Sequence, residues 1–187
     1  MKHSSLWQAA GFAFGTLAGT VLHFLYDWTG GNSIAALFSG VNESTWEHMK
    51  LLFWPLLLFA LVQRFFFREE NYWPVQLASI LLGITMIPVL FYTWNGIFGK
   101  SPDWVNIAIF YIAAAAAYWF QWWAFRKSLF QWKHPQLSLG AILLLGALFM
   151  VFTFAAPKIP LFQDPVTGEY GIFIPTGQTV RSGYGWF

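Results

Sequence analysis

The sequence predicts an all-α integral membrane protein with five transmembrane helices. Hydrophobic residues make up 57 % of the 187 residues and charged residues only 10 %, whereas a soluble domain carries about 25 % charged residues. Five segments are mostly apolar over roughly 20 residues or more, the length that crosses the hydrocarbon core of a bilayer. These segments cover residues 6–28, 43–67, 73–97, 104–125 and 137–156.

Each segment is compatible with a spanning helix. The first follows a basic start, Lys2 and His3, as a signal peptide does, but its apolar run is long and has no small-residue cleavage pattern. We therefore expect a retained helix. Pro55 and Pro88 lie inside the second and third segments, where neighbouring helices can satisfy the carbonyl groups that a proline frees.

The distribution of Lys and Arg predicts the orientation of the chain in the membrane, because cytoplasmic helix ends carry the excess of basic residues. One set of ends carries Lys2, Arg64, Arg68, Arg126, Lys127 and Lys133. The opposite set carries Lys50, Lys100, Lys158 and Arg181. We expect a multi-pass protein of the cytoplasmic (inner) membrane, with its N-terminus in the cytoplasm and its C-terminus outside.

The chain is expected to divide into a transmembrane bundle, residues 1–156, and an extracytoplasmic tail, residues 157–187. Residues 159–163 and 169–174 are strand-like, and between them Pro165 and Gly168 are placed as in a type I turn closed by a glycine. The pattern predicts a short β-hairpin over the outer mouth of the bundle. The alternative is an aromatic flap with no role in chemistry.

Polar residues concentrate at the outer ends of the first three segments. Thr16, Thr20, His23 and Asp27 follow one another at helical spacing and share one face. Asn42 is placed as a helix N-cap at the start of the second segment. The outer ends are therefore predicted to surround one pocket, which the tail covers. The supporting residues are expected to be Tyr26, Asn42, Ser44, Trp46, Lys50, Tyr92 and Asn95.

Ionisable groups at membrane depth are costly and persist when they pair, line water or take part in function. One hypothesis is a hydrolase or transferase that acts on a lipid-linked or membrane substrate, with acid–base residues His23, Glu43, Glu47 and His48. A metal version uses a divalent ion such as zinc, held by His23, Asp27, Glu43 and His48. A third version pairs Ser44 as nucleophile with His48.

Two non-enzymatic alternatives remain open from the sequence. The polar stripe could line an ion path in a small channel or transporter. Against this, we expect few polar residues in the cytoplasmic half besides Thr16, Ser79 and Thr85. The polar cluster could instead fix helix packing in a subunit of a membrane complex, with Glu47 paired to Lys50. The expected partners are the bilayer, a lipid-like substrate and further copies of the chain. A net charge of +2 gives no argument for nucleic acid.

Three motifs carry a resemblance to a known family: His23-x-x-Tyr26-x-Trp28, then Asn42-Glu43-Ser44-x-Trp46-Glu47-His48-x-Lys50, then Asp164-Pro165-x-Thr167-Gly168-x-Tyr170-Gly171. With these motifs the chain resembles a family of small prokaryotic integral membrane proteins known as a domain of unknown function. The resemblance spans nearly the whole chain, and Asn42–His48 is its most specific part. It implies the membrane topology and singles out these residues without naming a reaction.

Overall fold

The computed structural model describes residues 4–172, and within them every long element is a helix. The helices are α1 (Ser4–Trp28), α2 (Ser33–Ala36), α3 (Thr45–Gln63), α4 (Tyr72–Phe98), α5 (Asp103–Arg126) and α6 (Gln136–Phe154), followed by a 3-10 turn, η1 (Pro160–Phe162). All except α2 and η1 are long and apolar enough to cross a membrane. The predicted all-α architecture with five membrane-spanning helices is confirmed.

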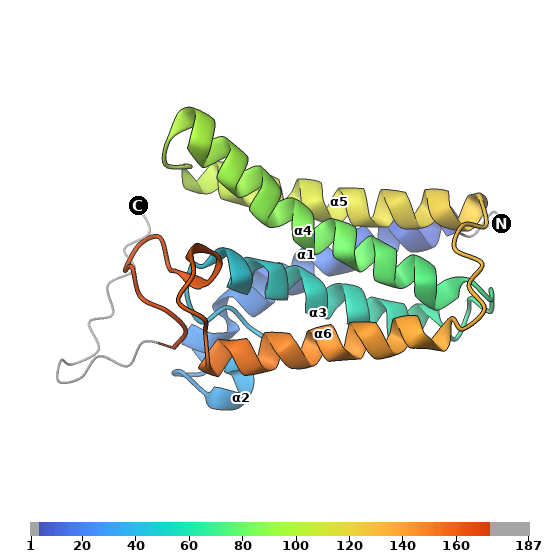
Figure 1. Ribbon diagram of the computed structural model, residues 1–187, viewed down its shortest axis with the longest axis horizontal. Coiled ribbons are helices and arrows are strands. Elements are labelled where there is room, and N and C mark those ends of the chain that lie inside the picture. The colour runs from blue at the N-terminus through green and yellow to red at the C-terminus, as the bar shows by residue number, and fades with distance from the viewer. Residues whose placement is uncertain (1–3, 173–187) are drawn as a thin grey trace.

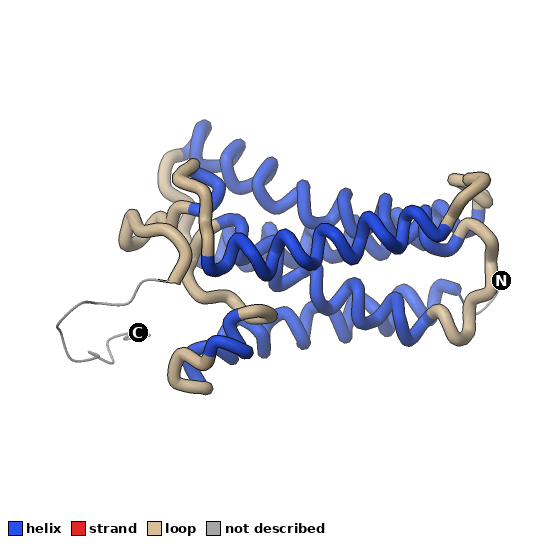
Figure 2. Tube along the Cα trace, turned by 60° about the horizontal axis from the view of Figure 1, so that its bottom comes forward, coloured by secondary structure: helices blue, strands red, loops and turns tan. Residues whose placement is uncertain are grey.

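The five long helices lie side by side along one axis, with connecting loops at both ends (Figures 1 and 2). Helices α1, α3, α4 and α5 form a closed ring in which each packs on the next, and α6 packs outside this ring on α3 and α4. Helix α3 is the most enclosed of the five spans. The first two turns of α3 carry four of the predicted site residues, Trp46, Glu47, His48 and Lys50.

The two ends of the bundle differ in their connections. One end carries the N-terminus and the α3–α4 and α5–α6 loops, and the other carries α2, the α4–α5 turn and the tail (Figure 1). We call the first end the basic end, because Arg64, Arg68, Arg126 and Lys133 lie there. We call the second the polar end.

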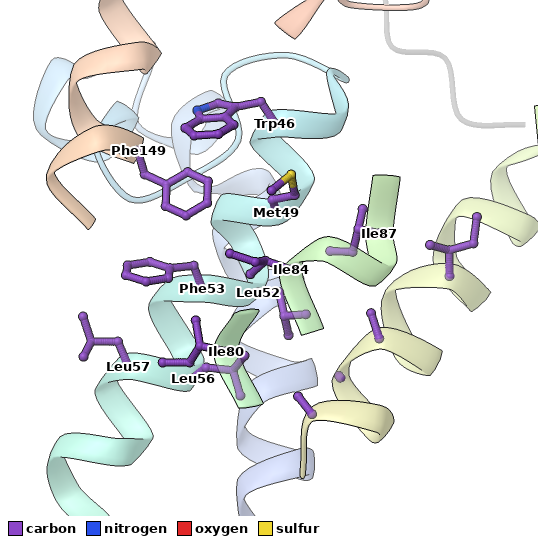
Figure 3. Packing of buried hydrophobic residues seen from close by; sticks show 14 of the residues in the cluster. Trp46, Met49, Leu52, Phe53, Leu56, Leu57, Ile80, Ile84, Ile87 and Phe149 are labelled. Atoms are coloured by element: carbon purple, nitrogen blue, oxygen red, sulfur yellow. The ribbon is translucent and has the colours of Figure 1, made fainter. Parts of the chain in front are cut away.

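The apolar core lies along α3 and is rich in aromatic rings near the polar end. Trp46 faces Phe149 of α6 with 4.4 Å between ring centroids, and Phe53 lies 5.0 Å from Phe149 (Figure 3). Phe162 of η1 also packs against Trp46, with 4.6 Å between the ring centroids. The tail is thus attached to the core through Trp46, which explains how a segment after the last helix takes a fixed place over the polar end.

Glycines allow α1 to lie close to its neighbours in the ring. A Cβ atom at Gly11 would lie 2.4 Å from the Tyr118 ring of α5, and one at Gly19 would lie 2.5 Å from the ring of Phe110. Real Cβ atoms do not approach so closely, so only glycine permits this contact. The close approach holds α1 against α5, and a Cβ atom at Gly19 would also lie 3.2 Å from the Leu51 carbonyl oxygen of α3.

Two local predictions were wrong. The second predicted helix begins at Thr45 rather than residue 43, because Ser44 is its N-cap and accepts a hydrogen bond from the Glu47 amide at 3.4 Å. The predicted β-hairpin is also not formed within the described residues. Pro160 starts a 3-10 turn where the first strand was expected, and only an isolated antiparallel bridge joins Gln163 to Tyr170. Residues 173–174 of the second expected strand lie outside the described part of the chain.

Candidate functional site

A polar cavity of about 300 Å³ opens at the polar end of the bundle. Its walls come from the end of α1, the segment before α3, and the tail. His23, Tyr26 and Asp27 line it from α1. The size falls at the lower end of the range for small-molecule sites, roughly 300–1,000 Å³.

Glu43 lies between two imidazole rings. Its Oε1 atom is 3.8 Å from Nε2 of His23, and its Oε2 atom is 3.6 Å from Nε2 of His48. The two imidazole centroids are 5.7 Å apart. Glu43 is 44 % exposed, whereas the two histidine side chains are 26 % and 23 % exposed. A single half-exposed carboxylate therefore bridges two largely enclosed imidazoles, one from α1 and one from α3.

The backbone determines which nitrogen of His48 carries hydrogen. Nδ1 of His48 lies 3.0 Å from the carbonyl oxygen of Ser44, and a carbonyl oxygen only accepts hydrogen bonds. Nδ1 therefore donates, and in a neutral ring Nε2 presents a lone pair toward Glu43. Nε2 is therefore the nitrogen through which His48 faces the carboxylate of Glu43, at 3.6 Å from its Oε2 atom.

The Ser44 hydroxyl has a structural contact of its own. It caps α3, and His48 contacts the Ser44 carbonyl oxygen instead of the hydroxyl. The spacing of four residues, which suggested a nucleophile and its base, results here from an ordinary helical turn. The described geometry offers no Ser44–His48 nucleophilic pair.

Asn42 connects the cavity to the tail. Its Nδ2 donates to the carbonyl of Gly171 at 2.9 Å, and its Oδ1 accepts from the Ser44 amide at 2.9 Å. In the tail, Asp164 is buried and accepts from the amides of Val166 and Thr167 at 2.7 and 3.3 Å. These bonds form a compact turn in place of a hairpin, and Asp164, Thr167, Glu169 and Gly171 become the outer wall of the cavity.

Below the cavity, Glu47 and Lys50 form an enclosed ion pair with 2.5 Å between Oε2 and Nζ. Glu47 is 2 % and Lys50 0 % exposed. Lys50 also donates to the Ala36 carbonyl and the Thr153 hydroxyl, each at 2.8 Å, while Glu47 accepts from the Val41 amide at 3.2 Å. Lys50 has three acceptors for its three hydrogens. The pair joins α2, α3 and α6 at one point.

Replacing Thr153 with Val is expected to destabilise the protein by about 1–3 kcal/mol, because one hydrogen of a buried ammonium group loses its acceptor. Unfolding in mixed dodecyl maltoside and SDS micelles measures this change. Thr85→Val is the matched control, since the Thr85 hydroxyl donates only to the carbonyls of its own helix and is exposed. Equal stability of the two variants would contradict the role given to Thr153.

The structure places the remaining predicted residues elsewhere. Asn95 bonds to the Phe91 carbonyl and to Ser101, and Tyr92 is 41 % exposed; no described residue of α4 lines the cavity. The expectation that the third segment contributes was wrong, because the α4–α5 turn leads away from the tail (Figure 1). Trp46 is a core residue. Sequence reasoning missed Thr153, whose helical spacing from Phe149 gives no sign of a partner in α3.

The metal hypothesis lacks a ligand set. Residues 4–172 contain no group of three or more His, Cys, Asp or Glu side chains placed to hold a metal ion. His23 and His48 both direct a nitrogen at Glu43, and Asp27 is exposed at the end of α1. The predicted set of His23, Asp27, Glu43 and His48 therefore does not assemble as zinc ligands in the described part of the chain.

Five spanning helices and a polar cavity at one end define a multi-pass α-helical membrane protein with a histidine–carboxylate cluster at that end. The chain belongs to the Family of unknown function (DUF6512), whose model matches residues 1–172. This confirms the resemblance to a family of unknown function. No curated protein and no solved structure matches the chain.

Proposed function

We propose that the protein is a membrane-embedded acid–base enzyme, a hydrolase or transferase that acts on the headgroup of a lipid-linked substrate. The observation that carries the proposal is Glu43 between His23 and His48, with Nδ1 of His48 engaged by a backbone carbonyl. Positioned acid–base groups of this kind contribute about 10²- to 10⁴-fold to a reaction rate. The cavity lies at one end of the bundle, between the end of α1, the segment before α3 and the tail.

In the proposed reaction, the Glu43–His48 pair takes a proton from water or from an acceptor hydroxyl. The oxygen then bonds to the carbonyl carbon or phosphorus of the substrate, and the bond from that centre to the leaving oxygen breaks. Protonated His23, on the other side of Glu43, gives its proton to the leaving oxygen. The proton that the Glu43–His48 pair has taken up then passes from Glu43 to His23, and the site returns to its starting state. With water as acceptor the sum is an ester plus water going to an acid plus an alcohol.

The transport alternative has less support. Thr16 and Thr20, which suggested a polar stripe, donate to carbonyls of their own helix at 2.9 Å. Between them Phe110 packs on Gly19. The described residues thus give no polar route from the cavity through the middle of the bundle.

Headgroup release in lipid nanodiscs tests the proposal. The purified protein is incubated with carboxylic-ester lipids, phosphodiester lipids and polyprenyl diphosphate conjugates, and the products are measured by mass spectrometry. The expected result is time-dependent release from one class, absent in nanodiscs without protein. Absence of release from every class would contradict an enzyme of this type.

The proposal places the polar end outside the cytoplasmic membrane, as the basic loops at the other end favour. Because the chain has no Cys, a single introduced cysteine reports which side of the membrane its position faces. In intact cells, a membrane-impermeant maleimide is expected to label Val166→Cys, whose side chain is 67 % exposed, and to label Lys133→Cys only after permeabilisation. The reverse pattern would show that the cavity faces the cytoplasm.

A further inference from the structure

Four buried glutamines lie in the half of the bundle nearest the basic end, where few polar residues were expected. Gln8, Gln63, Gln76 and Gln121 come from α1, α3, α4 and α5, one from each helix of the ring. A neutral amide buried among apolar helices is stable only when its donors and acceptors are paired. The pairing of these four side chains therefore shows at which helix interfaces their hydrogen-bonding groups are satisfied.

The amides form a directional chain around the ring. Gln121 donates to Gln76, Gln76 donates to Gln63 at 2.9 Å, and Gln63 donates to Gln8 at 3.0 Å. The chain thus crosses the α5–α4, α4–α3 and α3–α1 interfaces. The α1–α5 interface is the only one of the ring's four interfaces that this chain leaves uncrossed.

Unpaired polar atoms lie on both sides of that interface. Within residues 4–172, Nε2 of Gln8 and Oε1 of Gln121 have no hydrogen-bond partner, although both are buried. The hydroxyl of Tyr118 on α5 is also buried and without a partner there. Each such group costs about 1–3 kcal/mol when it stays unpaired. One donor, one acceptor and one group that can do either are therefore available at the same interface.

A groove of about 460 Å³ runs along this interface. Gln8 and Tyr118 line it, and its remaining walls are mostly apolar, with Phe12 on one side and Trp119 on the other. Trp119 is 63 % exposed in a helix that is apolar enough to span a membrane, so the groove opens toward lipid. A ligand that enters from the bilayer therefore meets Gln8 and Tyr118, the two residues of the groove wall that carry unpaired atoms.

We propose that the α1–α5 groove binds the hydroxyl headgroup of a neutral membrane lipid, such as a diacylglycerol. A hydroxyl oxygen accepts from Gln8 and its hydrogen is donated to Tyr118, so that two of the three unpaired groups gain a partner. No described residue that lines the groove is charged, so a charged headgroup would lose its hydration without compensation. The apolar walls accommodate the first part of an acyl chain.

Photo-crosslinking tests this site. The probe is a diacylglycerol with a diazirine near the glycerol, and the comparison probe is its deoxy analogue, in which hydrogen replaces the hydroxyl. Both are added to the full-length protein in phosphatidylcholine nanodiscs, and labelled peptides are identified by mass spectrometry. The expected result is labelling of the α1 and α5 peptides that line the groove, about three- to tenfold stronger with the hydroxyl probe, as one or two hydrogen bonds would give.

Tyr118→Phe is the decisive variant, because it removes one oxygen that has no partner in the described structure and leaves the ring in place. It is expected to reduce labelling by the hydroxyl probe about threefold or more. Tyr111→Phe, on the exposed face of the same helix, is the matched control and should label as wild type. Gln8→Leu is a second test, with its fold checked by gel filtration and thermal unfolding.

Equal labelling by the hydroxyl and deoxy probes would overturn the proposal, since it would indicate acyl-chain packing alone. Labelling of α6 as strong as labelling of the groove would overturn it as well. The readout is binding at the end of the bundle opposite the cavity. A negative result here therefore leaves the proposed acid–base function untouched, and loss of that function leaves this site testable.

Discussion

Replacing Glu47 with Gln is expected to lower the free energy of unfolding by about 3–5 kcal/mol, the usual cost of leaving one member of a buried ion pair without its partner. Lys50 is 0 % exposed and its ammonium group lies 2.5 Å from Glu47. Without the carboxylate, the cation has only neutral acceptors, namely the introduced amide oxygen, the Ala36 carbonyl and the Thr153 hydroxyl. The loss is measured by unfolding in mixed micelles of dodecyl maltoside and SDS.

The double variant Glu47→Gln, Lys50→Met tests whether the loss of stability comes from the unpaired charge of Lys50. Removing both charges removes the desolvation cost, and replacing a buried ion pair with uncharged groups of similar volume is often neutral or stabilising. We expect the double variant to regain most of the stability that the single variant loses. Glu70→Gln, on an exposed side chain in the α3–α4 connection, serves as the control for a change of charge alone. A double variant as unstable as the single one would contradict the ion-pair account.

The second large effect concerns Glu43. The Glu43→Gln variant keeps the size and shape of the side chain but can no longer exchange a proton with His23 or His48. Headgroup release is expected to fall by about 10²- to 10⁴-fold. Because Glu43 is 44 % exposed, stability should change by no more than about 0.5 kcal/mol.

His23→Gln and His48→Gln extend this experiment to the two imidazoles. Each is expected to reduce headgroup release, because each removes one of the two groups that flank Glu43. His134→Gln is the matched control, since His134 lies in the α5–α6 connection at the basic end. Release that survives in both site variants as well as in the control would show that the histidines are not catalytic.

Much of the fold is predictable from the sequence because the membrane imposes a strict length and composition on each span. The five apolar segments agree with the helices to within a few residues at most ends. The errors occur at helix starts, where side-chain hydrogen bonds determine which residue caps the helix. Ser44 rather than Asn42 caps α3, because the Asn42 side chain is engaged by the Ser44 and Gly171 backbones.

The candidate site was predictable only in part. Helical spacing places His23 on the polar face of α1 and His48 near the start of α3, but spacing within one helix does not say which faces meet. Glu47 is next to His48 in the sequence and points into the bundle toward Lys50, whereas Glu43 precedes the helix and reaches both histidines. The glutamine chain was missed because its four members lie in different helices, and each appears in the sequence as an isolated polar residue.

The most direct test of the central claim compares two variants in one preparation scheme. The account assigns chemistry to Glu43 and stability to the pair of Glu47 and Lys50. It predicts that Glu43→Gln is folded with headgroup release lowered at least 10²-fold, and that Glu47→Gln, Lys50→Met retains release once folded. Undiminished release in Glu43→Gln would contradict the account.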